Sequence, residues 1–357
     1  MSSLKRLCRL IGTLACSAMF VTATYAAPVV SSVSGKLEPG QALTISGTGF
    51  GTKSTAAPLL FDTFESGSNG ASVGQSSAVV GKWDSGSGSE LVKYSTASPR
   101  SGKVSTLHDF KQSYNISLAK NGSFPTLYMS FWFKVDLADR RSRNFKLWRL
   151  YGDNDRLQMA WVYMCDSIVL SRQDDNAGFA QNFWNGQQYT PGQWHHVQLV
   201  MKESDPSVAN GTIQHFIDSK SQGSNSTAVQ TRYSQARFSQ LRIGHYWATD
   251  AIDSCSSSTG AKVYIDDVYV DTSWARVELG NASTYAQSTQ REVLVPTSWG
   301  GSKVEVTVPV NGFTAGQTAY LYVTDQNNVT QSAGFPVVVG AGAGQKVPQP
   351  PSAVQVQ

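Results

Sequence analysis

The sequence has 357 residues, which is enough for two domains and a sizeable hydrophobic core. Its 40% hydrophobic content excludes a disordered chain, and its 15% charged content is too low for a coiled coil. The formal net charge of +4 falls to +1 when Lys5, Arg6 and Arg9 are set aside, which argues against a nucleic-acid binder or a protein adsorbed to an anionic membrane.

The first 26 residues have the pattern of a secretory signal peptide. Basic residues at 5–9 precede an apolar run at 10–21 and small residues, with cleavage expected after Ala26. The chain is therefore expected to be periplasmic, secreted or on the cell surface. An alternative is lipidation of Cys16, which follows Leu14 and Ala15. No later segment approaches the roughly 20 apolar residues of a membrane helix, so we expect no integral membrane segment after signal removal.

Two cysteines, Cys165 and Cys255, remain after removal of the expected signal peptide. In an oxidising compartment their natural state is a single disulfide, and the alternative is two separate buried thiols. They do not predict a zinc site, because no pair of histidines accompanies them.

Short strands are expected at both ends of the mature chain. Residues 28–54 contain two strands separated by Gly and Pro turns, and residues 276–340 contain alternating or apolar strands. The segment at 40–51, GQALTISGTGFG, resembles the opening of an IPT/TIG domain, which is an immunoglobulin-like module. This resemblance implies a discontinuous module, 28–54 plus 276–340, with a large domain inserted in one loop. The alternative is two unrelated partial β-domains. Residues 341–357 are rich in Gly and Pro and predict a disordered tail.

Residues 57–275 contain strands with clear period-two alternation. In the strand at 127–135, one face is apolar, and the other face carries Tyr128, Ser130, Trp132 and Lys134. The strands at 194–202 and 241–247 repeat this pattern. We expect the apolar faces to form the core, and we expect the polar, aromatic faces to be open to water or to a ligand.

Several motifs in this insert resemble the concanavalin-like and laminin-G-like jelly-roll superfamily, which includes carbohydrate-binding modules and polysaccharide lyases. They are FDTFESG at 61–67, PGQWHHV at 191–197, QHFID at 214–218 and VYIDDVYV at 263–270. The fold class implied is all-β, with an antiparallel jelly-roll β-sandwich inserted into a smaller immunoglobulin-like β-sandwich.

The preferred function is polysaccharide binding on a concave sheet, with no nucleic-acid partner. Flat aromatic rings stack on sugar faces, and polar side chains bind hydroxyl and carboxylate groups. The candidate binding residues are Tyr128, Trp132, Lys134 and Arg149. Arg149 ends a basic run at 140–149, whose alternative interpretation is a solvated strand end.

The first alternative is a polysaccharide lyase acting on acidic glycans, as in the alginate-lyase-like families of this superfamily. Arg242 and Gln198 would then neutralise the uronate carboxylate, while His196 and Tyr246 would act as base and acid. This grouping assumes that all these strands share one sheet face. For His196, the alternative is a hydrogen-bonded structural residue. The second alternative function is a structural or adhesive cell-surface protein.

Four acids suggest a structural calcium site. In the carbohydrate-binding modules that the insert resembles, acids on the first and last strands hold Ca²⁺ through oxygen ligands. The corresponding residues here are Asp62, Glu65, Asp266 and Asp267. The alternative is surface acids that cap strand ends. No other cofactor is expected.

Overall fold

The computed structural model describes residues 26–84, 91–109, 116–119, 123–136, 144–152, 158–164, 167–174, 178–185, 189–222, 226–247, 262–310 and 312–340. These segments form antiparallel β-strands in three sheets and one short 3₁₀ turn, η2 (Tyr285–Gln287). The predicted all-β, antiparallel sandwich is confirmed. None of the described segments is a helix able to cross a membrane.

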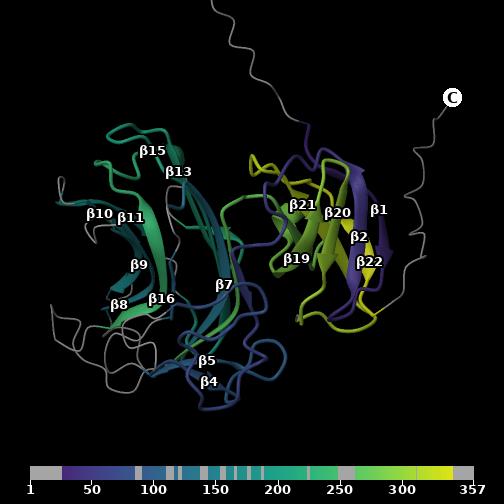
Figure 1. Cartoon of the computed structure of the whole chain (residues 1–357), viewed down its shortest axis with the longest axis horizontal. Helices are drawn as coiled ribbons and strands as arrows, with labels where there is room; N and C mark the ends of the chain where they lie inside the picture. The colour runs from purple at the N-terminus through teal and green to yellow at the C-terminus, as the bar shows by residue number, and fades with distance from the viewer. Residues whose placement is uncertain are drawn as a thin grey trace, which may run out of the picture.

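Two of the sheets face each other and form a body that we call the large sandwich (Figure 1). The 9-stranded sheet contains β3 (Leu60–Asp62), β4 (Lys93–Ser95), β5 (Ser105–Asp109), β7 (Thr126–Asp136), β12 (Trp194–Lys202), β13 (Gly211–Ile217), β14 (Lys220–Ser221), β15 (Ser226–Val229) and β17 (Lys262–Asp271). The 6-stranded sheet has the order β11 (Gly178–Asn185), β10 (Ser167–Asp174), β9 (Gln158–Met164), β8 (Asn144–Gly152), β16 (Phe238–Trp247) and β6 (Ile116–Ala119).

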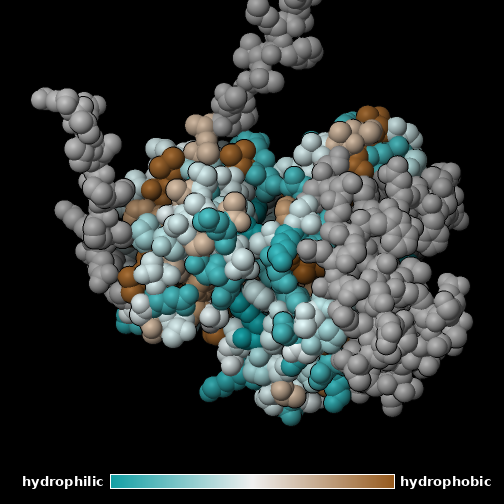
Figure 2. Space-filling view, turned by 180° about the vertical axis from the view of Figure 1, so that it is seen from behind, coloured by the Kyte–Doolittle hydropathy of each residue, from teal (hydrophilic) through white to brown (hydrophobic). Residues whose placement is uncertain are grey.

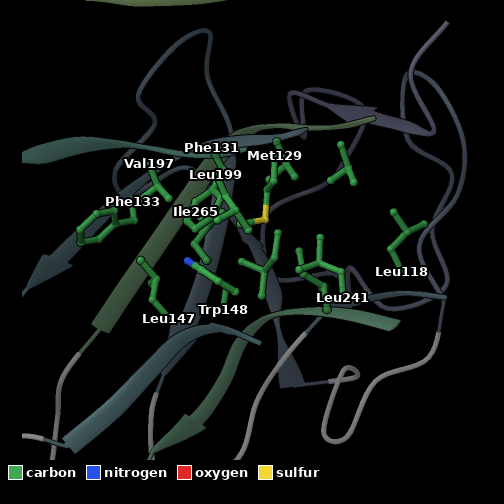
Figure 3. Packing of buried hydrophobic residues seen from close by; sticks show 14 of the residues in the cluster. Leu118, Met129, Phe131, Phe133, Leu147, Trp148, Val197, Leu199, Leu241 and Ile265 are labelled. Atoms are coloured by element: carbon green, nitrogen blue, oxygen red, sulfur yellow. The ribbon is translucent and has the colours of Figure 1, made fainter. Parts of the chain in front are cut away.

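The core of the large sandwich lies between these two sheets. Phe131 and Phe133 of β7 pack with Val197 of β12 and, from the facing sheet, with Trp148 and Leu241 (Figure 3). All five are fully buried, and those on β7, β12 and β16 occupy the apolar faces that the alternation predicted. The expected inward face of each of these strands is therefore confirmed.

The third sheet joins strands from the two ends of the chain. Its order is β1 (Val29–Gly35), β2 (Ala42–Thr48), β20 (Lys303–Thr307), β19 (Arg291–Trp299), β18 (Arg276–Gly280), β21 (Thr318–Thr324) and β22 (Phe335–Val338). Strand β1 also contacts β21 and β22, so this sheet folds back around a separate core. We call it the terminal module; in Figure 1 its purple and yellow-green strands lie side by side. Its membership of the IPT/TIG family stays a prediction.

Glycines are needed where β2 ends against β1. A Cβ on Gly47 would lie 1.9 Å from the carbonyl oxygen of Val29, so only glycine allows the two backbones to approach this closely. Gly49 has a φ of +73°, a conformation that L side chains rarely adopt. These two requirements explain part of the glycine-rich segment that follows β2.

The segment that leaves the terminal module lies beside the segment that returns to it. The Lys53 Nζ atom is 2.7 Å from the Asp271 Oδ2 atom, and both side chains are buried. Tyr269 donates a hydrogen bond to the same Asp271 oxygen. A buried ion pair with a further hydrogen bond therefore ties the two connections together.

Candidate functional site

The outer face of the 9-stranded sheet carries several of the predicted binding residues. The antiparallel register places His196 opposite Trp132 and Gln198 opposite Ser130, so β7 and β12 present them on one face, as their alternation implies. This face is not open, however. Tyr128 is 0% exposed, Trp132 is 8% exposed and Gln198 is 2% exposed.

The terminal module covers this face. An apolar cluster joins Tyr128, Val200 and Tyr269 of the large sandwich to Val293 and Val295 of β19. Figure 2 shows hydrophilic residues along the line where the two halves of the molecule meet. The expectation that the polar, aromatic face is open to water or ligand is therefore wrong for these strands, because it packs against another part of the same chain.

A buried network centred on Glu278 forms one half of this interface. The Glu278 carboxylate accepts hydrogen bonds from the Arg276 Nε atom at 2.9 Å, the Tyr285 hydroxyl at 2.9 Å and the Gln198 amide at 3.0 Å. Gln198 also donates to the Tyr128 hydroxyl. Burial alone would raise the pKa of Glu278, but Arg276 and neighbouring groups lower it below its ordinary value. Glu278 is therefore ionised at neutral pH and holds the module to the sandwich.

Arg100 organises the other half of the interface. Its guanidinium donates to Glu292 of the module and, at 3.1 Å, to Asp267 of β17. It also lies 3.9 Å from the centre of the Trp132 ring, whose other partner is the His196 ring at 4.7 Å. Trp132 is thus held between a cation and an imidazole, so it has no face free for a sugar.

Lys134, the remaining candidate on this face, is half-buried, and its Nζ donates to the Ser98 hydroxyl at 3.0 Å. His196 is almost fully buried, and its Nε2 is 2.7 Å from the Ser130 hydroxyl. Burial, together with the charges of Arg291 and Arg100, lowers the pKa of His196 well below its ordinary value. A neutral, covered imidazole cannot reach a polymeric substrate.

The four residues proposed for a lyase are not brought together. His196 and Gln198 lie on β12 in the 9-stranded sheet, whereas Arg242 and Tyr246 lie on β16 in the 6-stranded sheet. The assumption of one shared face is therefore wrong. The sequence could not reveal that these strands lie in different sheets, because alternation indicates which side of a strand is polar but not which sheet the strand joins.

A different pair of predicted residues does meet, on the outer face of the 6-stranded sheet. Arg149 of β8 is directly opposite Arg242 of β16 in the antiparallel register. Both guanidinium groups lie over the Tyr151 ring, at 4.9 and 4.3 Å from its centre. The Arg242 Nε atom donates to the Gln240 side chain at 2.7 Å. Both arginines are partly exposed.

Tyr246 lies further along β16, past a change of register, where its backbone pairs with Lys146 of β8. The side chain of Tyr246 lies outside the described part of the structure. So do Cys165, Cys255, the expected signal peptide up to residue 25 with Cys16, and the expected tail at 341–357.

The four acids of the expected calcium site each have other partners. Asp62 accepts hydrogen bonds from the Trp83 indole at 2.7 Å and from the backbone of Phe64, and Glu65 accepts from two backbone N–H groups. Asp266 accepts from the backbone N–H of Arg100, and Asp267 binds the side chain of that residue. Among the described residues no group of three or more His, Cys, Asp or Glu side chains is placed to hold a metal ion, and the calcium site stays a prediction.

Sequence reasoning did not select Arg276, Glu278 and Arg291 as important residues. The available signal was the alternation of Arg276 and Glu278 with the buried Val277 and Leu279 on β18, whereas Arg291 begins β19 beside Glu292 without such a pattern. Charged residues at such regular positions on strands predict a second, polar face. Which residues that face contacts depends on how the terminal module packs against the large sandwich. The periodicity of a single strand gives no information about this packing.

Comparisons with known proteins found no matching family model and no matching curated protein. Among solved structures, the chain is similar to the endo-beta-1,4-glucuronan lyase from the fungus Trichoderma reesei, with 15% identity, a TM-score of 0.41, and coverage of 52% of this chain and 87% of that chain. It is also similar to alginate lyase Aly36B, with 13% identity, a TM-score of 0.42 and coverage of 60% and 98%. A third similar structure is the marine PL-14 alginate lyase from Aplysia kurodai, with 9% identity, a TM-score of 0.40, and coverage of 51% of this chain and 87% of that chain.

Proposed function

We propose that the protein binds an acidic polysaccharide on the outer face of the 6-stranded sheet. The observation that carries this proposal is the pairing of Arg149 with Arg242 above the ring of Tyr151. A guanidinium binds a carboxylate through two parallel hydrogen bonds, so two neighbouring, partly exposed guanidinium groups suit a carboxylate-bearing polymer.

The binding site moves from the face first expected to the opposite side of the large sandwich. Of the predicted carbohydrate-binding residues, Arg149 supports the proposal, and Arg242 keeps its role of neutralising a uronate. Tyr128 and Trp132 do not support it, because they are buried beneath the terminal module. A strand face with two arginines and an amide matches a repeating anionic polymer better than a neutral glycan.

Affinity measurements with alginate, glucuronan and pectate, beside a neutral glucan, test this proposal. The double variant Arg149→Ala/Arg242→Ala should weaken binding of the preferred acidic polymer by about tenfold or more, because it removes two charge-assisted contacts. Lys303→Ala is the matched control, because it removes an exposed positive charge from the terminal module, where the Lys303 side chain is 58% exposed. Equal affinities for the double variant and the wild type would refute the proposal.

A lyase activity is the second candidate, because Arg242, the expected partner of a uronate carboxylate, lies on this face and Tyr246 belongs to the same strand. In β-elimination a base removes the C5 proton, the electron pair forms the C4–C5 double bond, and the C4–O bond breaks as the leaving oxygen takes a proton. Ultraviolet absorbance of the unsaturated product detects this reaction. Activity that Tyr246→Phe abolishes would support the lyase, and no product from any acidic polymer would exclude it.

Either activity requires the chain to meet polysaccharide outside the cytoplasm, as the predicted signal peptide implies. Mass spectrometry of the mature N-terminus tests this requirement. A terminus after Ala26 supports export by that signal, whereas an acylated Cys16 identifies a lipoprotein.

A further inference from the structure

A cleft of about 370 Å³ lies between β12 and β13 of the large sandwich and the terminal module. Its volume falls within the roughly 300–1,000 Å³ of small-molecule sites. Its lining includes three aromatic rings and two guanidinium groups. The rings belong to Tyr128, Phe216 and Tyr285, and the guanidinium groups belong to Arg276 and Arg291. The cleft is separate from the Arg149–Arg242 face, which lies on the other sheet.

The charges beside this cleft belong to a larger buried cluster. Arg276 and Arg291 carry two positive charges, Glu278 carries one negative charge, and all three side chains are at least 95% buried. Glu292, which follows Arg291 in the chain, and Asp267 are both engaged by Arg100. Glu278 therefore serves two guanidinium groups, while Arg100 has two carboxylates of its own.

Arg291 is the guanidinium group that has an unused hydrogen-bond donor. Arg276 donates to Glu278, Asn328 and Tyr285. Arg291 donates a hydrogen bond to Gln198 at 3.0 Å, stays 4.0 Å from Glu278, and has no partner for its Nε atom among the described residues. Because an arginine offers five N–H donors, Arg291 retains capacity for an anion.

The other lining groups indicate what kind of anion fits. The Arg291 guanidinium lies 4.1 Å from the centre of the Tyr285 ring, and the Arg276 guanidinium lies 4.2 Å from that of the buried Tyr128. The aromatic surface that is partly exposed in the lining comes from Phe216 and Tyr285. Ser219, Ser221 and Thr330 add hydroxyl groups to the lining. Aromatic faces suit the C–H face of a sugar ring, hydroxyl groups suit its substituents, and a guanidinium suits a carboxylate.

We propose that this cleft is a second site, which binds a small carboxylate-bearing sugar of one or two hexuronate rings. The bound carboxylate accepts hydrogen bonds from the Arg291 guanidinium. The sugar ring lies against the aromatic lining. This site does not require polymer binding on the 6-stranded sheet, because no residue is shared between the two places.

Calorimetric titration of the full chain with glucuronate tests the proposal, and glucose serves as the neutral probe. Glucuronate should bind the wild type and the Arg149→Ala/Arg242→Ala variant with equal affinity. Arg291→Gln should weaken binding by about tenfold to a hundredfold, because it removes a charge-assisted contact. Ala286→Trp should also abolish binding, because Ala286 is an exposed residue of the lining where a large side chain would close the cleft. Ala286→Ser is its control and should bind normally.

Ala286→Trp keeps the test valid if Arg291→Gln fails to fold, because it leaves the buried network intact. Three results would overturn the proposal. They are no binding of glucuronate by the wild type, equal binding of glucose, and loss of glucuronate binding in the Arg149→Ala/Arg242→Ala variant alone. The third result would place the sugar on the 6-stranded sheet and so support the proposed function while excluding the second site.

Discussion

Replacing Glu278 with glutamine should strongly destabilise the contact between the terminal module and the large sandwich. Glutamine keeps the size of the side chain but removes the carboxylate that binds Arg276, and its amide would face the amide of Gln198. Two guanidinium groups, Arg276 and Arg291, would then remain buried without a counter-ion from this network.

Removing one partner of a buried ion pair costs about 3–5 kcal/mol. This is a large share of the roughly 5–15 kcal/mol that stabilises a typical native protein. The control is Glu305→Gln, which breaks the pair of Lys303 and Glu305 on the surface of the same module, where the two side chains are 58% and 40% exposed. An exposed pair contributes only about 0–1 kcal/mol.

Urea unfolding, followed by tryptophan fluorescence, measures both variants. We expect Glu278→Gln to lose several times more free energy of unfolding than Glu305→Gln. The double variant Glu278→Gln/Arg291→Gln should recover about 1 kcal/mol or more, because it removes a cation that has lost its partner. Equal losses in the two single variants would refute the view that this network holds the module in place.

The difference in free energy of unfolding between the wild type and Glu278→Gln should also depend on pH. The folded-state pKa of Glu278 lies below its ordinary value of 4.5, because Arg276 and Arg291 outweigh the effect of burial. Its stabilising contribution is therefore fully present above the ordinary pKa and is lost as the pH falls through the lowered one. If the difference in free energy of unfolding grew as the pH fell, it would contradict a lowered pKa for Glu278.

Three further predictions concern other parts of the structure. Trp132→Ala should cost about 3–5 kcal/mol of stability, because the ring is buried between Arg100 and His196, yet it should leave acidic-polymer affinity unchanged; reduced affinity in a folded variant would return this residue to the binding site. Burial raises the pKa of Asp62 to about 6, so stability should fall by about 3 kcal/mol as the pH rises from about 4 to about 6, and unfolding measurements on Asp62→Asn should lack this slope. Gly47→Ala should cost about 1–3 kcal/mol, whereas Gly301→Ala, whose added Cβ meets its nearest atom at 3.8 Å, should be nearly neutral in the same assay.

The sequence by itself determined much of the local structure. Period-two alternation identified β7, β12 and β16, and it separated core residues such as Phe131 and Leu199 from polar ones such as Trp132 and Gln198. This information is local, because successive side chains of a strand point to opposite faces whatever the strand later packs against. The all-β fold class and the inward faces followed from it.

The tertiary structure decided which polar face is covered and which is exposed. His196 and Arg242 have the same kind of position in their strands, but β12 lies in the sheet that the terminal module covers and β16 lies in the other sheet. The covering residues Arg276, Glu278 and Arg291 come from strands outside the large sandwich. Whether two such surfaces pack together depends on complementary shape and charge between distant segments, and the periodicity of a single strand carries no record of that complementarity.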